Sequence, residues 1–239
     1  MKDRLSTFDM SGLLLSLSGI VLGILLGVAD YHVSWSTASA LILTVVPMHI
    51  YMRTSGRLPL AASVAGAVLT VYLSYRTLFS LESLLLLLFA YFIMRMAKGM
   101  GGRSKISDAF LACFLKGPVA LVGAYFVCTH TFPFWIVVLP SLSVGLLAVA
   151  ADGTEDGYGR ELVTFIIFIG VIIMPFFAFL RIFSWLHYIF VAVIPAFAYI
   201  VAKMYTKKEQ PLAVYKSALS VCTFAFAFLA GLGFVIHLF

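Results

Sequence analysis

The chain has 239 residues, of which 63% are hydrophobic and only 11% are charged. Soluble domains are about 25% charged, so this composition excludes a water-soluble fold of ordinary size. The apolar stretches are continuous rather than alternating. They therefore indicate membrane-spanning helices of about 20 residues and exclude the short alternating strands of a membrane β-barrel.

Glycines, prolines and charged residues divide the chain into nine apolar segments. Each segment is close to the length of a helix that crosses a bilayer. The loops between them are short, so we expect one transmembrane domain over residues 1–239 and no separate soluble domain. In chain order, the predicted helices cover residues 9–29, 35–53, 59–75, 81–96, 108–127, 134–151, 162–180, 185–203 and 214–238.

The basic residues predict the orientation of this all-α bundle. With nine helices and a cytoplasmic N-terminus, thirteen of the sixteen lysines and arginines fall in cytoplasmic loops, and only Arg76 and Arg181 fall outside. This bias is typical of an integral membrane protein, here with its C-terminus outside. The net charge of +6 thus indicates orientation and needs no nucleic-acid partner. Short loops and the lack of a targeting signal favour a bacterial inner membrane.

Two predicted cytoplasmic loops are basic. The loop after the second helix contains Arg53 and Arg57 and no carboxylate, and the loop after the fourth carries Lys98, Arg103 and Lys105 around a run of glycines. Lysine and arginine side chains and exposed backbone N–H groups bind phosphate well. The alternative interpretation is that these charges only enforce the topology or contact anionic lipid head groups.

Lys116 is the one cation well inside a predicted span. A charge buried in the membrane is costly, so such residues usually face a cavity or a partner. Lys116 also lies about two turns from the start of the fifth helix, from where its side chain could reach the cytoplasmic interface. The sequence leaves both interpretations open.

The loop after the sixth helix carries four of the ten carboxylates in the chain. Asp152 and Asp156 are four residues apart, and on a helical turn this spacing places both on one face. Together with Glu155 they could share a Mg²⁺ ion, which prefers oxygen ligands. The alternative is a solvated loop whose acids keep it soluble. The sequence holds no second acidic cluster to complete such a site.

These features resemble the UbiA superfamily of intramembrane prenyltransferases, and most closely its dihydroxynaphthoate polyprenyltransferase branch, which serves menaquinone synthesis. The resemblance rests on nine helices, on the Asp152-x-x-x-Asp156 motif and on the glycine-rich basic loop after the fourth helix. It also includes residues 15–23, 117–126, 139–147 and 211–233. It implies a UbiA-like helical bundle around a cavity in which a prenyl diphosphate is held through Mg²⁺.

The resemblance also implies roles for single residues. Asp152 and Asp156 correspond to the carboxylates of the second acidic motif of the family, and Gly159-Arg160 resembles the Gly-Lys pair that follows it. The first acidic motif, an Asn-Asp-x-x-Asp run after the second helix, has no counterpart. The candidate metal ligands are Asp152, Glu155 and Asp156, and the candidate phosphate-binding residues are Lys98, Arg103, Lys105, Arg53, Arg57, Lys116 and Arg160.

One acidic cluster instead of two would stabilise the charge of a diphosphate leaving group poorly. We therefore expect a degenerate, non-catalytic homologue that keeps an isoprenoid- or quinone-sized cavity and acts as a binding or partner subunit. Small residues such as those at 61–67 favour contact with a membrane protein partner. The alternative is a divergent, active enzyme that moves a polyprenyl group from its diphosphate to an aromatic acceptor with Mg²⁺. Small-molecule transport is a third possible class of function, but no buried acidic residue suggests a path for a coupling ion.

Overall fold

The computed structural model describes residues 10–31, 33–53, 64–66, 68, 72, 105–131, 138–181 and 185–236. Within these ranges every regular element is a helix. Two of the helices are shorter apolar segments, Trp35–Pro47 and Val138–Gly153. Five are long and apolar enough to cross a bilayer, so the protein is an all-helical membrane protein: Met10–Asp30, Ala109–Thr129, Arg160–Leu180, Leu186–Thr206 and Leu212–Ile236.

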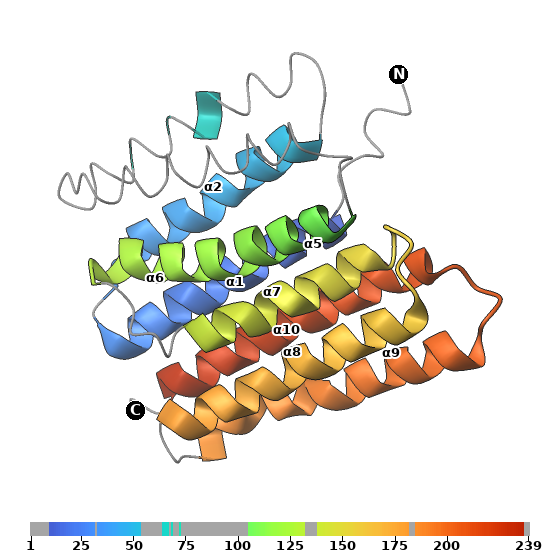
Figure 1. Ribbon diagram of the computed structural model, residues 1–239. Helices are drawn as coiled ribbons and strands as arrows, with labels where there is room; N and C mark the ends of the chain where they lie inside the picture. Colours follow the sequence, from blue (N-terminus) through green and yellow to red (C-terminus); the bar gives the residue numbers. More distant parts are fainter. Residues whose placement is uncertain are drawn as a thin grey trace.

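The helices of the described residues follow the predicted order (Figure 1). Three spans change their helix type partway along. The fifth predicted helix is α-helical at both ends with a π-helical turn between, and the eighth and ninth each begin with a 3₁₀ segment. The elements are α1 (Met10–Asp30), α2 (Trp35–Arg53), α5 (Lys105–Phe114), η2 (Leu115–Val119), α6 (Ala120–Thr129), α7 (Val138–Gly153), α8 (Arg160–Arg181), η4 (Trp185–Val193), α9 (Ile194–Thr206), η5 (Leu212–Tyr215) and α10 (Lys216–Ile236).

Seven of the nine predicted helices coincide with these elements to within a few residues. The differences are at the ends: α5 starts three residues before the predicted 108, the described part of α7 starts four residues after the predicted 134, and α9 ends three residues after the predicted 203. Of the predicted helix at 59–75 only residues 64–66, 68 and 72 are described, and they are helical. The predicted helix at 81–96 lies outside the described residues.

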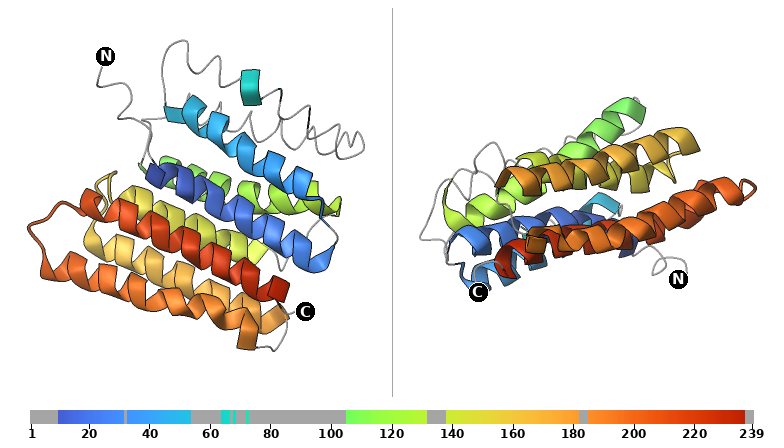
Figure 2. Two further views of the ribbon diagram at one scale, coloured as in Figure 1. Left: turned by 180° about the vertical axis from the view of Figure 1, so that it is seen from behind. Right: turned by 90° about the horizontal axis from the view of Figure 1, so that it is seen from below.

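The helices form two layers. The view from below in Figure 2 shows α5–α6, α7 and α8 in one layer and α1, α10 and the η4–α9 helix in the other. Direct packing joins α7 to α8 and α1 to α10 within the layers, and α1 to α6 and α7 to α10 between them. Helix α2 packs outside α1. The centre of the bundle is therefore made by α1, α7 and α10.

Small residues allow α1 and α6 to approach closely. Gly19, Gly23 and Gly27 recur every four residues on one face of α1. A Cβ atom at Gly19 would lie 2.9 Å from the Cβ of Ala120, and one at Gly23 would overlap the carbonyl oxygen of Leu121. In a membrane, helices associate through close packing rather than through the hydrophobic effect, so this glycine face allows α6 to lie directly against α1.

In contrast to the glycine face of α1, helix α8 carries large, exposed apolar side chains. Its large apolar side chains at 165, 168, 172, 176 and 179 are exposed along the helix. Inside the bundle, by contrast, the Ser143 hydroxyl of α7 is buried and donates a hydrogen bond to the Gly170 carbonyl of α8, at 2.6 Å. Apolar groups outside and satisfied polar groups inside are what a lipid environment requires.

Candidate functional site: an ion-paired acidic turn

The acidic turn between α7 and α8 retains one helical turn beyond the end of α7. The N–H groups of Glu155 and Asp156 both donate to the carbonyl oxygen of Asp152, at 2.9 and 3.1 Å. The turn then closes at Gly157, whose φ of 76° is in the left-handed region, and the Tyr158 N–H donates to the carbonyl oxygen of Gly153. This is the hydrogen-bond pattern of a glycine-terminated helix end. It keeps Asp152 and Asp156 on one turn, as their spacing predicts.

Lys116 reaches this turn from the π-helical segment η2. Ala120 donates its N–H to the carbonyl oxygen of Leu115, five residues back, and this wider turn accommodates Pro118, which has no N–H of its own. Directly beside Lys116, Gly117 packs against α7, where an added Cβ would lie 2.9 Å from the Cα of Gly145. The close crossing of η2 and α7 places Lys116 next to the last turn of α7.

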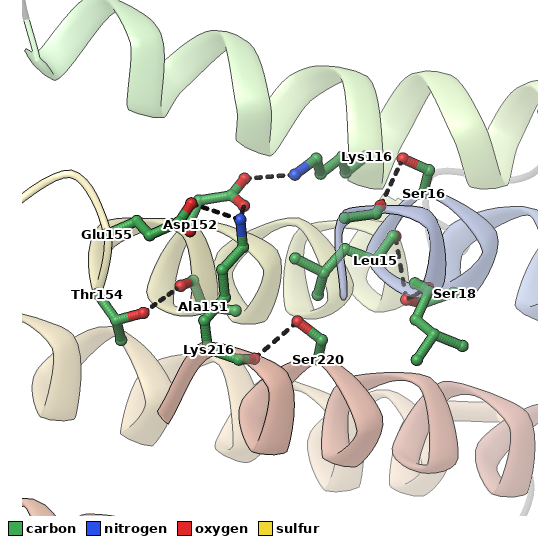
Figure 3. Close-up of polar contacts among 12 residues, drawn as sticks. Leu15, Ser16, Ser18, Lys116, Ala151, Asp152, Thr154, Glu155, Lys216 and Ser220 are labelled. Carbon is green, nitrogen blue, oxygen red and sulfur yellow. Dashed lines mark hydrogen bonds and ion pairs between the residues drawn. The ribbon is translucent and has the colours of Figure 1, made fainter. Parts of the chain in front are cut away.

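The Lys116 ammonium donates to the carboxylate of Asp152, and the two form an ion pair (Figure 3). Their side chains are 19% and 17% exposed, so the pair is largely withdrawn from water. Lys116 therefore has a partner, and this partner lies at the end of α7, toward which a side chain reaching the interface would also extend. That partner is one of the two aspartates predicted to bind a metal.

A second lysine approaches the acidic turn from α10. Lys216 is the first residue of α10 and is only 4% exposed. Its Nζ atom lies 2.6 Å from Oε2 of Glu155 and 4.0 Å from Oδ1 of Asp152. Figure 3 shows Asp152 between the two lysines, each from a different span. We refer to Lys116, Asp152, Glu155 and Lys216 as the lysine–carboxylate cluster.

In the sequence, Lys216 counts only among the basic residues that predict orientation, and its place in the site was not predicted. The signal that could have found it is its position directly before the last span, at the same membrane end as the acidic turn. A lysine at the start of a helix and carboxylates at the end of one both oppose the usual preference of the helix dipole. Such charges need partners on neighbouring helices, and Lys216 and Glu155 provide them for each other.

Asp156, like Glu155, is exposed at the acidic turn. Partial removal from water raises the pKa of its carboxyl above the ordinary value, and the charges of Asp152 and Glu155 raise it further. The two lysines of the cluster act in the opposite direction. Two lysines against three carboxylates leave the region with a formal charge of −1, and this residual charge adds to the effect of desolvation in raising the pKa of Asp156.

No protein-family model, no curated protein and no solved structure significantly matches this chain. Its site is therefore interpreted from its own geometry.

The acidic turn does not offer a free carboxylate cluster to a metal. In the described part of the chain, no three histidine, cysteine, aspartate or glutamate side chains converge where they could hold an ion. Asp152 and Glu155 accept instead from lysine ammonium groups. A Mg²⁺ ion that took these two oxygens would have to displace a lysine from each of them.

Arg160, the first residue of α8, is bonded to the loop between α9 and α10. Its Nη2 atom donates to the carbonyl oxygens of Lys208 and Gln210, at 2.5 and 3.1 Å. The guanidinium thus has a structural role there, and the structure does not bring it into the lysine–carboxylate cluster.

The remaining predicted phosphate-binding residues are not placed by the structure. Arg53 is the last residue of α2 and Lys105 is the first of α5, but their side chains are not described. Arg57, Lys98 and Arg103 lie outside the described residues. Of the ten predicted site residues, the structure therefore brings Lys116 together with Asp152, Glu155 and Asp156 at one end of the bundle.

Proposed function

We propose that this protein is a degenerate, non-catalytic homologue of the UbiA-type prenyltransferases. In this proposal it forms a nine-span bundle in a bacterial inner membrane, with a cytoplasmic N-terminus and an external C-terminus. It binds an isoprenoid- or quinone-like lipid, or acts as a subunit beside another membrane protein. The observation that carries the proposal is the lysine–carboxylate cluster, in which ammonium groups take the carboxylate oxygens that a Mg²⁺–diphosphate site would use.

The charge that surrounds the leaving group separates binding from turnover. When a prenyl diphosphate ionises, the leaving diphosphate develops negative charge. Preorganised positive charge must stabilise it there, and metal ions supply this charge in this type of chemistry. Lys116 and Lys216 are positive, but their charge is already compensated by Asp152 and Glu155. Residues 48–57, where the family carries its first acidic motif, contain no carboxylate. Both differences support binding without turnover.

One observation favours the alternative of a divergent, active prenyltransferase. Asp152 and Asp156 lie on one turn, and the raised pKa of Asp156 indicates that the turn would accept additional positive charge. In that case Mg²⁺ would displace the lysines when a diphosphate arrives, and the basic residues would bind the diphosphate oxygens. Only the active enzyme predicts that Mg²⁺ strengthens diphosphate binding, so one experiment separates the two functions.

The experiment is thermal unfolding of the purified full-length protein with farnesyl diphosphate or a longer prenyl diphosphate, with and without Mg²⁺. We expect no Mg²⁺-dependent rise in melting temperature and no transfer to an aromatic acceptor. A quinone or isoprenoid alcohol should still raise the melting temperature by binding the folded state. The matched control is the Asp152→Ala, Asp156→Ala double variant. A Mg²⁺-dependent rise that disappears in this variant would establish the active enzyme instead.

A further inference from the structure

The loop between α9 and α10, residues 207–211, is held in place by side chains of other elements. Arg160 of α8 donates to the carbonyl oxygens of Lys208 and Gln210. The Tyr215 hydroxyl donates to the carbonyl oxygen of Lys203, at 3.1 Å, and lies 3.3 Å from the Gln210 side-chain oxygen. The backbone adds a further bond, from the Lys207 N–H to Lys203 at 3.0 Å. The loop is therefore ordered in advance of any contact it makes.

The basic side chains of this loop point to solvent. Lys207 and Lys208 are exposed, and Lys203 lies one turn earlier with its ammonium 5.3 Å from the centre of the Tyr199 ring. Among the described residues, the ion pairs of lysine belong to Lys116 and Lys216, and these three lysines take part in none. With Arg160, and against Glu161 and Glu209, they give this corner of the bundle a formal charge of +2.

The loop also joins two segments long enough to cross a membrane, Leu186–Thr206 and Leu212–Ile236. Apolar side chains next to the lysines are exposed, with Tyr199 at 62% and Val214 at 59%. A ligand at this place meets positive charge on its water side and hydrocarbon on its membrane side. A phospholipid with an anionic head group has both properties, whereas an acidic soluble protein would meet only the lysines.

We propose that the α9–α10 loop, with Lys203, Lys207 and Lys208, binds the phosphate group of an anionic phospholipid. The lysines supply the charge, and Arg160 and Tyr215 position the loop backbone so that little ordering cost remains on binding. A lysine next to an anionic lipid surface increases affinity about 5-fold. This site lies on different residues from the lysine–carboxylate cluster and does not depend on the isoprenoid proposal.

The test uses the full-length protein in lipid nanodiscs of phosphatidylcholine with increasing phosphatidylglycerol, and measures retained lipid by native mass spectrometry together with the melting temperature. Phosphatidylglycerol should raise the melting temperature of the natural protein. The Lys207→Gln, Lys208→Gln variant should lose about 25-fold in phosphatidylglycerol affinity. Its melting temperature in pure phosphatidylcholine should equal that of the natural protein, because both side chains are exposed.

Two matched controls isolate the charge. The Lys207→Arg, Lys208→Arg variant should retain binding, and Glu209→Gln should strengthen it by removing the only carboxylate within the loop. Inorganic phosphate at the same concentration should not stabilise the protein, because it lacks the acyl chains. Equal binding by the glutamine variant, equal stabilisation by phosphatidylcholine, or full replacement by inorganic phosphate would each overturn the proposal.

Discussion

Two groups of lysines lie at the same end of the bundle and are used in opposite ways. Lys116 and Lys216 are withdrawn from water and pair with the carboxylates that follow α7. Lys207 and Lys208 are exposed on the α9–α10 loop, whose backbone is held by Arg160. Figure 1 shows both the turn after α7 and the α9–α10 loop at one end of the helices.

The comparison shows that a positive charge at a membrane boundary does not by itself reveal its function. Lys207, Lys208 and Lys216 all count toward the positive-inside pattern that predicts orientation, whereas Lys116 lies within a predicted span. The four lysines differ in what lies next to them. Lys116 and Lys216 pair with carboxylates of the acidic turn after α7, whereas Lys207 and Lys208 are exposed on the α9–α10 loop. The first pair joins the spans to one another, and the second pair is available to a ligand.

Removal of Asp152 should have the largest effect. The Asp152→Ala change leaves the ammonium of Lys116 without its carboxylate and removes the more distant partner of Lys216. Breaking a fully buried ion pair costs about 3–5 kcal/mol, and the partial exposure of this pair reduces our expectation to about 2 kcal/mol. Unfolding in mixed micelles followed by circular dichroism measures the change.

Asp156→Ala is the matched control for that prediction, since it removes an exposed carboxylate from the same turn. Adding Lys116→Met to Asp152→Ala should recover part of the lost stability, because both members of the pair are then absent. Equal losses in Asp152→Ala and Asp156→Ala would contradict the role assigned to the cluster.

The second prediction compares the two groups of lysines directly. Lys216→Gln should lower the free energy of unfolding by about 1–2 kcal/mol, because it leaves Glu155 without its ammonium partner and removes a nearly buried charge. Lys208→Gln should change it by less than about 0.5 kcal/mol, as is usual for an exposed side chain. Parallel unfolding curves in a zwitterionic detergent provide the measurement, and similar losses in the two variants would remove the distinction.

The smallest effect concerns Asp156 and pH. Its folded-state pKa is raised, so the folded protein loses stability as pH rises from the ordinary carboxyl value of about 4 through that raised pKa. Asp156→Asn cannot ionise and should avoid this loss. We expect its melting temperature to exceed that of the natural protein at pH 7 by about 1 °C, given solvent screening. The two should converge near pH 3.5, and a gap that widens on acidification would show the opposite sign.

The parts of this protein that depend on local sequence could be predicted well. Seven predicted helices coincide with observed ones because continuous apolar segments and their glycine and charge boundaries act over a single helix length. The neighbouring positions of Asp152 and Asp156 follow from helical spacing alone. The π-helical turn in η2 was not predicted, although Gly117 and Pro118 mark the place where an α-helix would lose a bond.

By itself, the sequence determined the membrane class, most of the described helices and the acidic turn, because these depend on composition and on spacings of a few residues. Only the tertiary structure decided which lysine meets which carboxylate. Lys116 and Asp152 are 36 residues apart, and Lys216 and Glu155 are 61 apart. Their meeting depends on how η2, α7 and α10 cross, and close glycine contacts such as that of Gly117 with Gly145 control this crossing. No local pattern contains that information.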